Sequence, residues 1–383
     1  MIDDGGTDAL GEPSERSREF ADAERLTKVV QAAFGSGRRI VTATRLANGS
    51  KKGVYRLLLD DRESVIVYVW NTAEDYWHGI LPEGADDPAD PFSHASGLDL
   101  FEAATRRLEA AGVRSPRLLL ADRSGTHYPG DVAVVEDVSA CTLEALLERD
   151  PVGADLVMGR FSELVDALHG YQRPVGSQGG DGDGDRNGNG HGVNGGNGDG
   201  DDDTVPAFGK VGLIDSGGLS NGTACEQVIV NRALAEVAEI ASADPLAAAG
   251  RKALEETLYG LAAQIQPRTK YGLVHGELGP DHVLVGKDRE PVLIDIEGLM
   301  YFDVEWEHVC MRLRFGEFYG RLANSDRLDR DALDEQRLRL YRLAMHLSLV
   351  AGPRRIAAGD HPAREWFLEI ADYHLQQALE AVG

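Results

Sequence analysis

The stretch Tyr271-Gly-Leu-Val-His-Gly-Glu-Leu-Gly-Pro-Asp-His-Val-Leu-Val285 decides the fold, together with Val292-Leu-Ile-Asp-Ile-Glu297 shortly after it. The first stretch indicates an apolar strand, a polar loop and a second short strand. The second stretch indicates a buried strand that ends in acidic residues. We therefore expect the polar loop and the acidic residue Asp295 to meet in a cleft, where the apolar strands hold them in place.

The spacing of these polar residues is similar to that of protein kinases, which place H-R-D-x-x-x-x-N before D-F-G because phosphoryl transfer needs a base and metal ligands. The chain resembles the aminoglycoside phosphotransferase family, the small-molecule branch of the protein-kinase-like fold. That family shows V-H-G-D-x-x-x-x-N-V-L-V and then I-D-W/F-E, where this chain has Val274–Val285 and Ile294–Glu297. The resemblance implies an α+β, two-lobed fold with a small antiparallel-sheet N-lobe and a large helical C-lobe. The chain differs from the family at the positions of the catalytic Asp, the metal-binding Asn and the third-strand Lys.

Length and composition agree with a two-lobed protein. The chain has 383 residues, 42% of them apolar, which is enough for a substantial core. It has no apolar run of membrane-spanning length, and the acidic start lacks the features of a signal peptide. Three isolated cysteines indicate neither disulfides nor a cysteine metal site. We expect a cytoplasmic protein.

The formal net charge of −25 argues against nucleic acid and anionic membranes as partners. An acidic surface is compatible with a cationic acceptor, but solubility or a saline host would explain it equally well. The oligomeric state is left open by the sequence.

The chain divides into four parts on its hydrophobic pattern. Residues 1–38 form a polar tail and an amphipathic helix, and residues 39–136 form the nucleotide-binding N-lobe. This N-lobe is predicted to hold five strands and one helix, at residues 39–45, 54–59, 64–70, 95–111 (the helix), 117–121 and 131–136. Residues 137–383 form the helical C-lobe, with its catalytic-type loop at 274–297. Helices are expected in this lobe at 143–148, 155–171, 224–242, 246–266, about 329–350 and about 362–381. Within the C-lobe, Gly, Asp and Asn make up 23 of the 28 residues of 176–203, so we predict a disordered insertion there.

Asp295, Glu277 and His282 are the candidate catalytic and metal-binding residues. Asp295 stands at the position of the family's metal-binding Asp and is predicted to bind Mg²⁺. Glu277 replaces the catalytic Asp with the same functional group on a longer stem, so it could act as base toward the acceptor hydroxyl. His282 replaces the metal-binding Asn; it could ligate the metal or hold the loop by hydrogen bonds, although Mg²⁺ prefers oxygen.

The phosphate-binding cation has to come from elsewhere than the third strand, where Tyr68 stands in the place of the kinase lysine. The segment Gly49-Ser-Lys-Lys-Gly-Val-Tyr55 resembles the G-S-x-K-x-V-Y of the with-no-lysine kinases, which carry the lysine on the glycine-rich loop and second strand. That resemblance implies Lys52 as the phosphate-binding residue, with Gly49 and Ser50 in the nucleotide loop. Glu102, on the predicted helix at 95–111, is the expected partner of Lys52; a solvated helix acid is the alternative.

Two further residues are predicted to support the loop. The resemblance implies that His275 packs under it and that Glu307 replaces a buried Asp which ties the loop to the helical lobe.

The resemblance implies an enzyme that uses ATP and Mg²⁺ to phosphorylate a hydroxyl of a small molecule. The acceptor could be an aminoglycoside or another cationic antibiotic or metabolite. The alternative is a kinase-fold binding or regulatory protein that has lost catalysis, which the three departures from the family would explain. The sequence names neither the acceptor nor the nucleotide, ATP or GTP.

Overall fold

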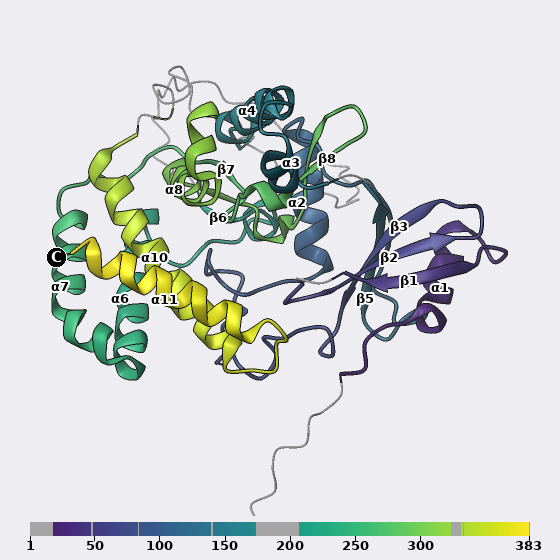
Figure 1. Ribbon diagram of the computed structural model, residues 1–383, viewed down its shortest axis with the longest axis horizontal. Helices are drawn as coiled ribbons and strands as arrows, with labels where there is room; N and C mark the ends of the chain where they lie inside the picture. The colour runs from purple at the N-terminus through teal and green to yellow at the C-terminus, as the bar shows by residue number, and fades with distance from the viewer. Residues whose placement is uncertain are drawn as a thin grey trace, which may run out of the picture.

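The computed structural model describes residues 18–46, 49–82, 84–138, 141–173, 207–322, 331 and 333–382. Residues 1–17 of the predicted polar tail, the predicted insertion at 176–203 and residues 323–330 lie outside these ranges. The described chain forms two lobes, with a small sheet at one end and a helical body at the other (Figure 1). The predicted α+β, kinase-like fold is confirmed.

The small lobe is a five-stranded antiparallel sheet of order β1-β2-β3-β5-β4. Its strands match the predicted runs: β1 Ile40–Arg45, β2 Gly53–Leu59, β3 Ser64–Trp70, β4 Leu118–Asp122 and β5 Asp131–Glu136. β5 ends at Glu136, where we propose that the first lobe passes into the second.

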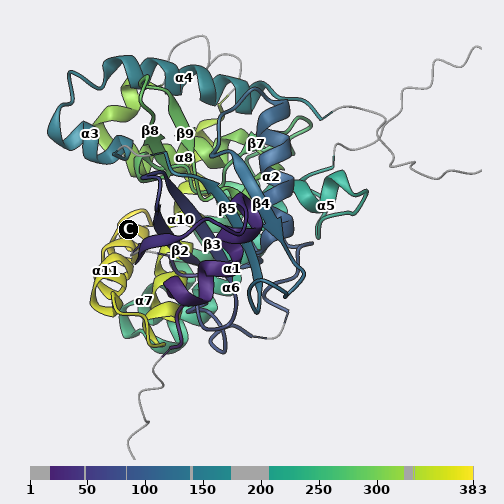
Figure 2. The same ribbon diagram turned by 90° about the vertical axis from the view of Figure 1, so that its right-hand side faces the viewer.

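Two helices cover the two faces of this sheet, as Figures 1 and 2 show. Alternate side chains of β3 point to opposite faces. On one face Val67 and Val69 pack with α1 (Ala23–Phe34), and on the other Tyr68 and Trp70 pack with α2 (Leu98–Ala110). The sheet is therefore buried on both faces, and α2 joins it to the core of the larger lobe.

The larger lobe is mostly helical. Its helices are α3 Leu143–Arg149, α4 Asp155–Gly170, α5 Val211–Asp215, α6 Cys225–Ala243, α7 Pro245–Ala262, α8 Val304–Phe315, α10 Glu335–Ala357 and α11 Arg364–Glu380. No helix within the described ranges has the length and apolar content needed to span a membrane.

Short strands carry the predicted catalytic-type loop within this lobe. β6 (Gly209–Lys210), β10 (Met300–Phe302) and β7 (Gly272–Val274) form a three-stranded sheet, and β8 (Val283–Val285) pairs with β9 (Pro291–Leu293). The loop after β7 and the turn after β9 therefore emerge from two adjacent sheets, which fixes the polar residues between them.

Candidate active site

Lys52 stands directly before β2, and its side chain crosses to the C-lobe. The Lys52 ammonium contacts both Asp295, at 2.8 Å from Oδ1, and Glu297. Burial lowers the pKa of Lys52, but the two carboxylates outweigh burial and raise that pKa above its ordinary value. The positive charge of Lys52 in turn lowers the pKa of Asp295 well below its ordinary value.

Tyr68 lies beneath this ion pair. The ammonium of Lys52 is 5.2 Å from the centre of the Tyr68 ring, in cation–π contact. Since Val54 pairs with Tyr68 across β2 and β3, Lys52 enters the site two residues before that pair. The lysine from β2 thus reaches the space over the third-strand position that Tyr68 occupies.

The expected pairing of Lys52 with Glu102 is wrong. Glu102 of α2 instead forms an ion pair with Arg123, while Lys52 is engaged by Asp295 and Glu297. α2 packs against the short helical turn Ile296–Gly298. Glu297, which lies in this turn, is the glutamate that contacts Lys52. Glu297 is a site residue that our sequence reasoning missed, although it stands two residues after Asp295 in the quoted motif.

Asp295 adopts a left-handed backbone conformation, with φ 58° and ψ 48°. This conformation is uncommon for a residue with a side chain and tends to be found at functional sites. The Asp295 side chain remains 49% exposed although Lys52 binds one of its oxygens. Its second oxygen is therefore free to face an incoming group in the cleft.

His282 faces that second oxygen. Its Nδ1 lies 2.9 Å from the backbone carbonyl of Glu277, and because a carbonyl only accepts, Nδ1 carries the proton. In the neutral ring this leaves Nε2 with a lone pair, 3.9 Å from Asp295 Oδ2 and 3.6 Å from Asp281 Oδ2. Two ligand distances of about 2.1 Å would span such a gap, so the pair fits a divalent cation.

Glu277 lies at the start of the polar loop, and its side chain is exposed. Gly276 before it has φ 93°, which a residue with a side chain rarely adopts, so a glycine is required in this turn. The loop therefore presents the Glu277 carboxylate to solvent.

The loop is held from below as the resemblance implied. Glu307 is fully buried and accepts hydrogen bonds from the backbone N–H groups of His275 and, at 3.3 Å, Leu278. His275 is also buried, and its Nε2 donates to the carbonyl of Ile294 at 2.9 Å. Burial lowers the pKa of His275 to about 4, so the ring is neutral and its role is positioning.

Gly49 and Ser50 form the turn that leads to Lys52. A Cβ on Gly49 would lie 2.7 Å from the Lys52 carbonyl oxygen, so this close approach requires glycine. Ser50 accepts a hydrogen bond from the Trp77 indole at 3.1 Å, and its carbonyl accepts one from the Tyr76 N–H at 2.8 Å. The turn is thus fastened to the segment that follows β3.

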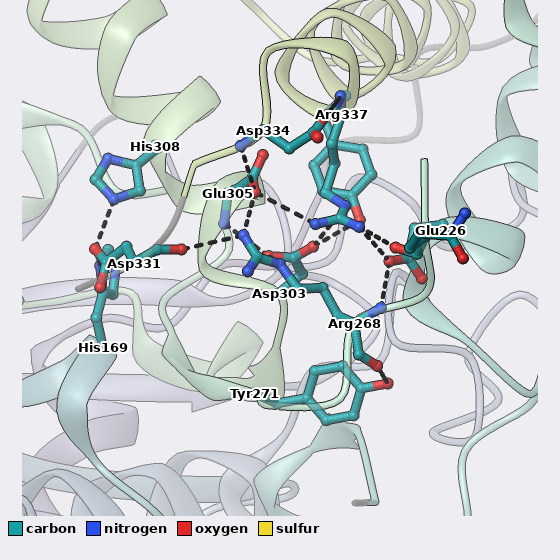
Figure 3. Close-up of polar contacts among 12 residues, drawn as sticks. His169, Glu226, Arg268, Tyr271, Asp303, Glu305, His308, Asp331, Asp334 and Arg337 are labelled. Atoms are coloured by element: carbon teal, nitrogen blue, oxygen red, sulfur yellow. Dashed lines mark hydrogen bonds and ion pairs between the residues drawn. The ribbon is translucent and has the colours of Figure 1, made fainter. Parts of the chain in front are cut away.

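A second cluster of polar residues lies away from this site. His169, His308 and Asp331 are buried and close enough to share a metal ion, as Figure 3 shows. His308 Nε2 lies 2.8 Å from Asp331 Oδ2, and His169 Nδ1 lies 3.3 Å from the same oxygen. Hydrogen bonds account for these contacts, so we assign no metal there.

The comparisons with known proteins agree with this geometry. A family model described as "Phosphotransferase enzyme family" matches residues 42–341. No curated protein sequence matches the chain. Among solved structures, an apo thermostable mutant of aminoglycoside phosphotransferase APH(4)-Ia is 15% identical with a TM-score of 0.55, covering 92% of this chain and 98% of its own.

Two further solved structures are similar. Spectinomycin phosphotransferase APH(9)-Ia, in complex with ADP and spectinomycin, is 14% identical with a TM-score of 0.56, covering 94% of this chain and 98% of its own. LicA in complex with AMP is 10% identical with a TM-score of 0.52, covering 94% and 99% respectively. At these identities the likeness shows the fold.

Proposed function

Because this chain belongs to the phosphotransferase enzyme family, we propose that it transfers the γ-phosphate of ATP to a hydroxyl of a small molecule. The observation that carries the proposal is the contact of Lys52 with Asp295 and Glu297 across the two lobes. It places a cation from the nucleotide loop beside the residue expected to hold the metal, which is what phosphate binding in a kinase-like fold requires. The similar structures that hold ADP or AMP support a nucleotide as donor.

Asp295 and His282 would hold the cation, since their free oxygen and nitrogen face each other. A divalent cation bound there would neutralise negative charge on the phosphates. Lys52 would contribute a second positive charge, and Gly49 with Ser50 would position the loop around the phosphates.

Glu277 would orient the acceptor hydroxyl and accept its proton. The acceptor oxygen then forms a bond to the γ-phosphorus while the bond to the β–γ bridging oxygen breaks, which gives ADP and a phosphate ester. The exposure of Glu277 is consistent with this role. Glu277 is one methylene longer than the Asp of the family, so the acceptor hydroxyl would have to bind correspondingly farther from the backbone of the loop. Small errors in this position lower the rate strongly.

The second candidate function is a kinase-fold binding protein without catalysis. One observation favours it: Lys52 already forms an ion pair with Asp295, so the carboxylate expected to hold the metal has a protein cation in contact with it. Both functions use the same fold, and they differ in whether Mg-ATP binds and is consumed.

Calorimetric titration of Mg-ATP tests the proposal, with Lys52→Ala and Asp295→Ala as variants and the exposed Lys287→Ala as control. We expect micromolar to millimolar affinity that both site variants weaken at least tenfold, roughly 1.4 kcal/mol, and that the control leaves unchanged. Absence of binding to ATP and GTP with every divalent metal tried would refute a phosphotransferase. Binding without ADP release on any acceptor hydroxyl would favour the second candidate.

A further inference from the structure

Lys210 is a buried cation beside the catalytic-type loop that no motif revealed. It ends β6 and is 3% exposed. Lys210 pairs with Met300 of β10, which pairs in turn with Val274 of β7. Residues paired across antiparallel strands point to the same face, so this row ends next to the His-Gly-Glu turn. The Cε atom of Met300 would lie 3.5 Å from a Cβ on Gly276, which confirms that the row reaches the turn.

Lys210 differs from the other buried cations of the described chain in having no ion-pair partner. Lys52 and Arg337 each contact two or more carboxylates. Within the described ranges, no carboxylate oxygen lies within 4.0 Å of the Lys210 Nζ atom. The Lys210 stem is buried, but its Nζ atom is not among the fully buried polar atoms without a hydrogen-bond partner, so the ammonium keeps access to solvent and is open to an anionic ligand.

Neighbouring charges locate Lys210 between the catalytic-type loop and the segment after β3. Burial, and then repulsion from Lys51, lower the pKa of Lys210 to about 8, whereas the charges of Glu277 and Asp90 raise it. Lys51 likewise has no ion-pair partner among the residues that the structure describes. Two lysines without an ion-pair partner in the described part of the chain therefore act on one space, together with the carboxylates of Glu277, Asp90 and Glu297.

A pocket of about 660 Å³ lies between the segment at 80–94 and helices α6 and α10, and its wall includes Asp90, whose charge acts on Lys210. Burial, and then the charges of Lys51, Arg232, Arg355 and Lys210, lower the pKa of His94 in its wall to about 3. Arg232 and Arg355 are already paired with Glu236 and Glu239. The positive charge on this side of the site that has no ion-pair partner in the described chain is thus that of the two lysines.

The pocket wall also offers neutral polar atoms. Ser93 Oγ and His94 Nδ1 are buried, and neither has a hydrogen-bond partner among the described residues. Such atoms are usually satisfied in a folded protein, so they indicate groups available to a polar ligand.

We propose that Lys210, with Lys51, binds an anionic group of the acceptor, so that the acceptor is a hydroxyl compound carrying a phosphate or carboxylate. Its body would occupy the adjoining pocket, with its hydroxyl at Glu277. This inference rests on the proposed phosphotransfer and names the acceptor class for the same site. It replaces the cationic acceptor that the overall acidity allowed, because Lys210 is a buried cation beside the loop that has no ion-pair partner among the described residues.

Inorganic phosphate is the probe that tests this position, titrated into protein saturated with Mg-ADP. We expect millimolar binding that Lys210→Met weakens at least tenfold, while exposed Lys287→Met has no effect. The affinity for Mg-ADP should stay within twofold of wild type in both variants. Methionine has a similar length and removes an unpaired buried charge, so the Lys210 variant should fold at least as well, which a thermal scan checks.

The other outcomes separate the possible sources of the anion. Weaker binding of Mg-AMP-PNP, with unchanged Mg-ADP binding, in Lys210→Met would assign Lys210 to the donor's γ-phosphate and overturn the proposal. Equal phosphate binding by variant and wild type would also overturn it, as would tighter binding of kanamycin than of glucose 6-phosphate. Failure of Mg-ADP itself to bind would instead count against the proposed function.

Discussion

At the scale of single residues, the charged groups of the site stand at other positions in the sequence than in a conventional kinase. The lysine expected on β3 stands before β2 as Lys52, and its facing glutamate stands after Asp295 as Glu297. Tyr68 fills the space left on β3 and lies under the ammonium. The same three charges meet as in a conventional kinase-like site, but they reach it from different positions in the sequence.

This exchange predicts that the lysine can be moved back. We expect Lys52→Met to lower the affinity for Mg-ATP at least tenfold, and Lys52→Met combined with Tyr68→Lys to restore part of the loss. The reason is that the Lys52 ammonium now lies 5.2 Å from the centre of the Tyr68 ring. A lysine at position 68 would therefore bring its ammonium into the same space. Calorimetry on the two variants, with melting temperatures as a check of folding, measures the effect. A double variant no better than Lys52→Met would contradict the idea.

Glu307 predicts a pH dependence of stability. Burial raises the pKa of Glu307 to about 7, above the ordinary value of 4.5. The folded state then binds this proton more tightly than the unfolded state, so the free energy of unfolding falls as pH rises from about 4.5 to about 7 and is level above. Raising this pKa from 4.5 to about 7 corresponds to roughly 3 kcal/mol of stability at low pH.

Urea unfolding at pH 5 and pH 7.5 checks this expectation. The decrease in stability between the two pH values should be smaller in Glu307→Gln than in wild type. Glu365→Gln, exposed on α11, serves as control and should keep the wild-type decrease. An unchanged decrease in Glu307→Gln would show that Glu307 does not titrate in this range.

At the scale of elements, a buried charge network holds α8 against its neighbours. Asp303 and Glu305, at the start of α8, lie between Arg268 and Arg337, as Figure 3 shows. Arg337 of α10 also lies 3.2 Å from Glu226 of α6. The network thus fixes the helix that carries Glu307, and through Glu307 the polar loop.

Removing one member should be strongly destabilising. Arg337→Met leaves buried carboxylates uncompensated, and we expect a loss of roughly 3 kcal/mol in the free energy of unfolding. Arg339→Met, exposed on the same helix two residues away, should change it by less than about 0.5 kcal/mol. Urea titrations of both variants give the comparison. Similar small losses in the two would mean that the network contributes little net stability.

The boundaries of elements followed the sequence where the pattern was regular. β3 has the predicted bounds, and α2, α4 and α6 lie within a few residues of theirs. The helix expected from 329 to 350 differs: α10 begins at Glu335, capped by Asp334, and continues through Pro353 to Ala357. A proline within a helix usually ends it, and here the packing of α10 against α11 and α6 outweighs that tendency.

At the scale of the whole molecule, the dominant feature is the excess of acidic residues. The net charge is −25, and self-repulsion at this charge opposes compact folding. We expect the melting temperature to rise by roughly 5 °C or more between 0.05 and 1 M KCl, as the screening length falls to about 3 Å. The rise should level off near 1 M if it is due to screening. A melting temperature that is constant over this range would show that the charges are well separated or already compensated.

The sequence by itself determined the fold and the polar loop of this protein. Alternating and helical apolar patterns are local properties of the chain, and the stretch from Tyr271 to Glu297 carries its strands, its loop residues and its metal-side acid within one short span. This is why Glu277, His282 and Asp295 could be named in advance, and why the roles assigned to them remain predictions that measurement must test.

Only the tertiary structure decided which charges meet. Lys52 faces Glu297 rather than Glu102, and Lys210 lies beside the turn before Glu277 because β6, β10 and β7 pair. Ion pairs and buried charges depend on how segments far apart in the chain pack together, and a local pattern holds no record of that packing. The carboxylate partners of Lys52 and the position of Lys210 beside the polar loop are therefore properties of the folded molecule.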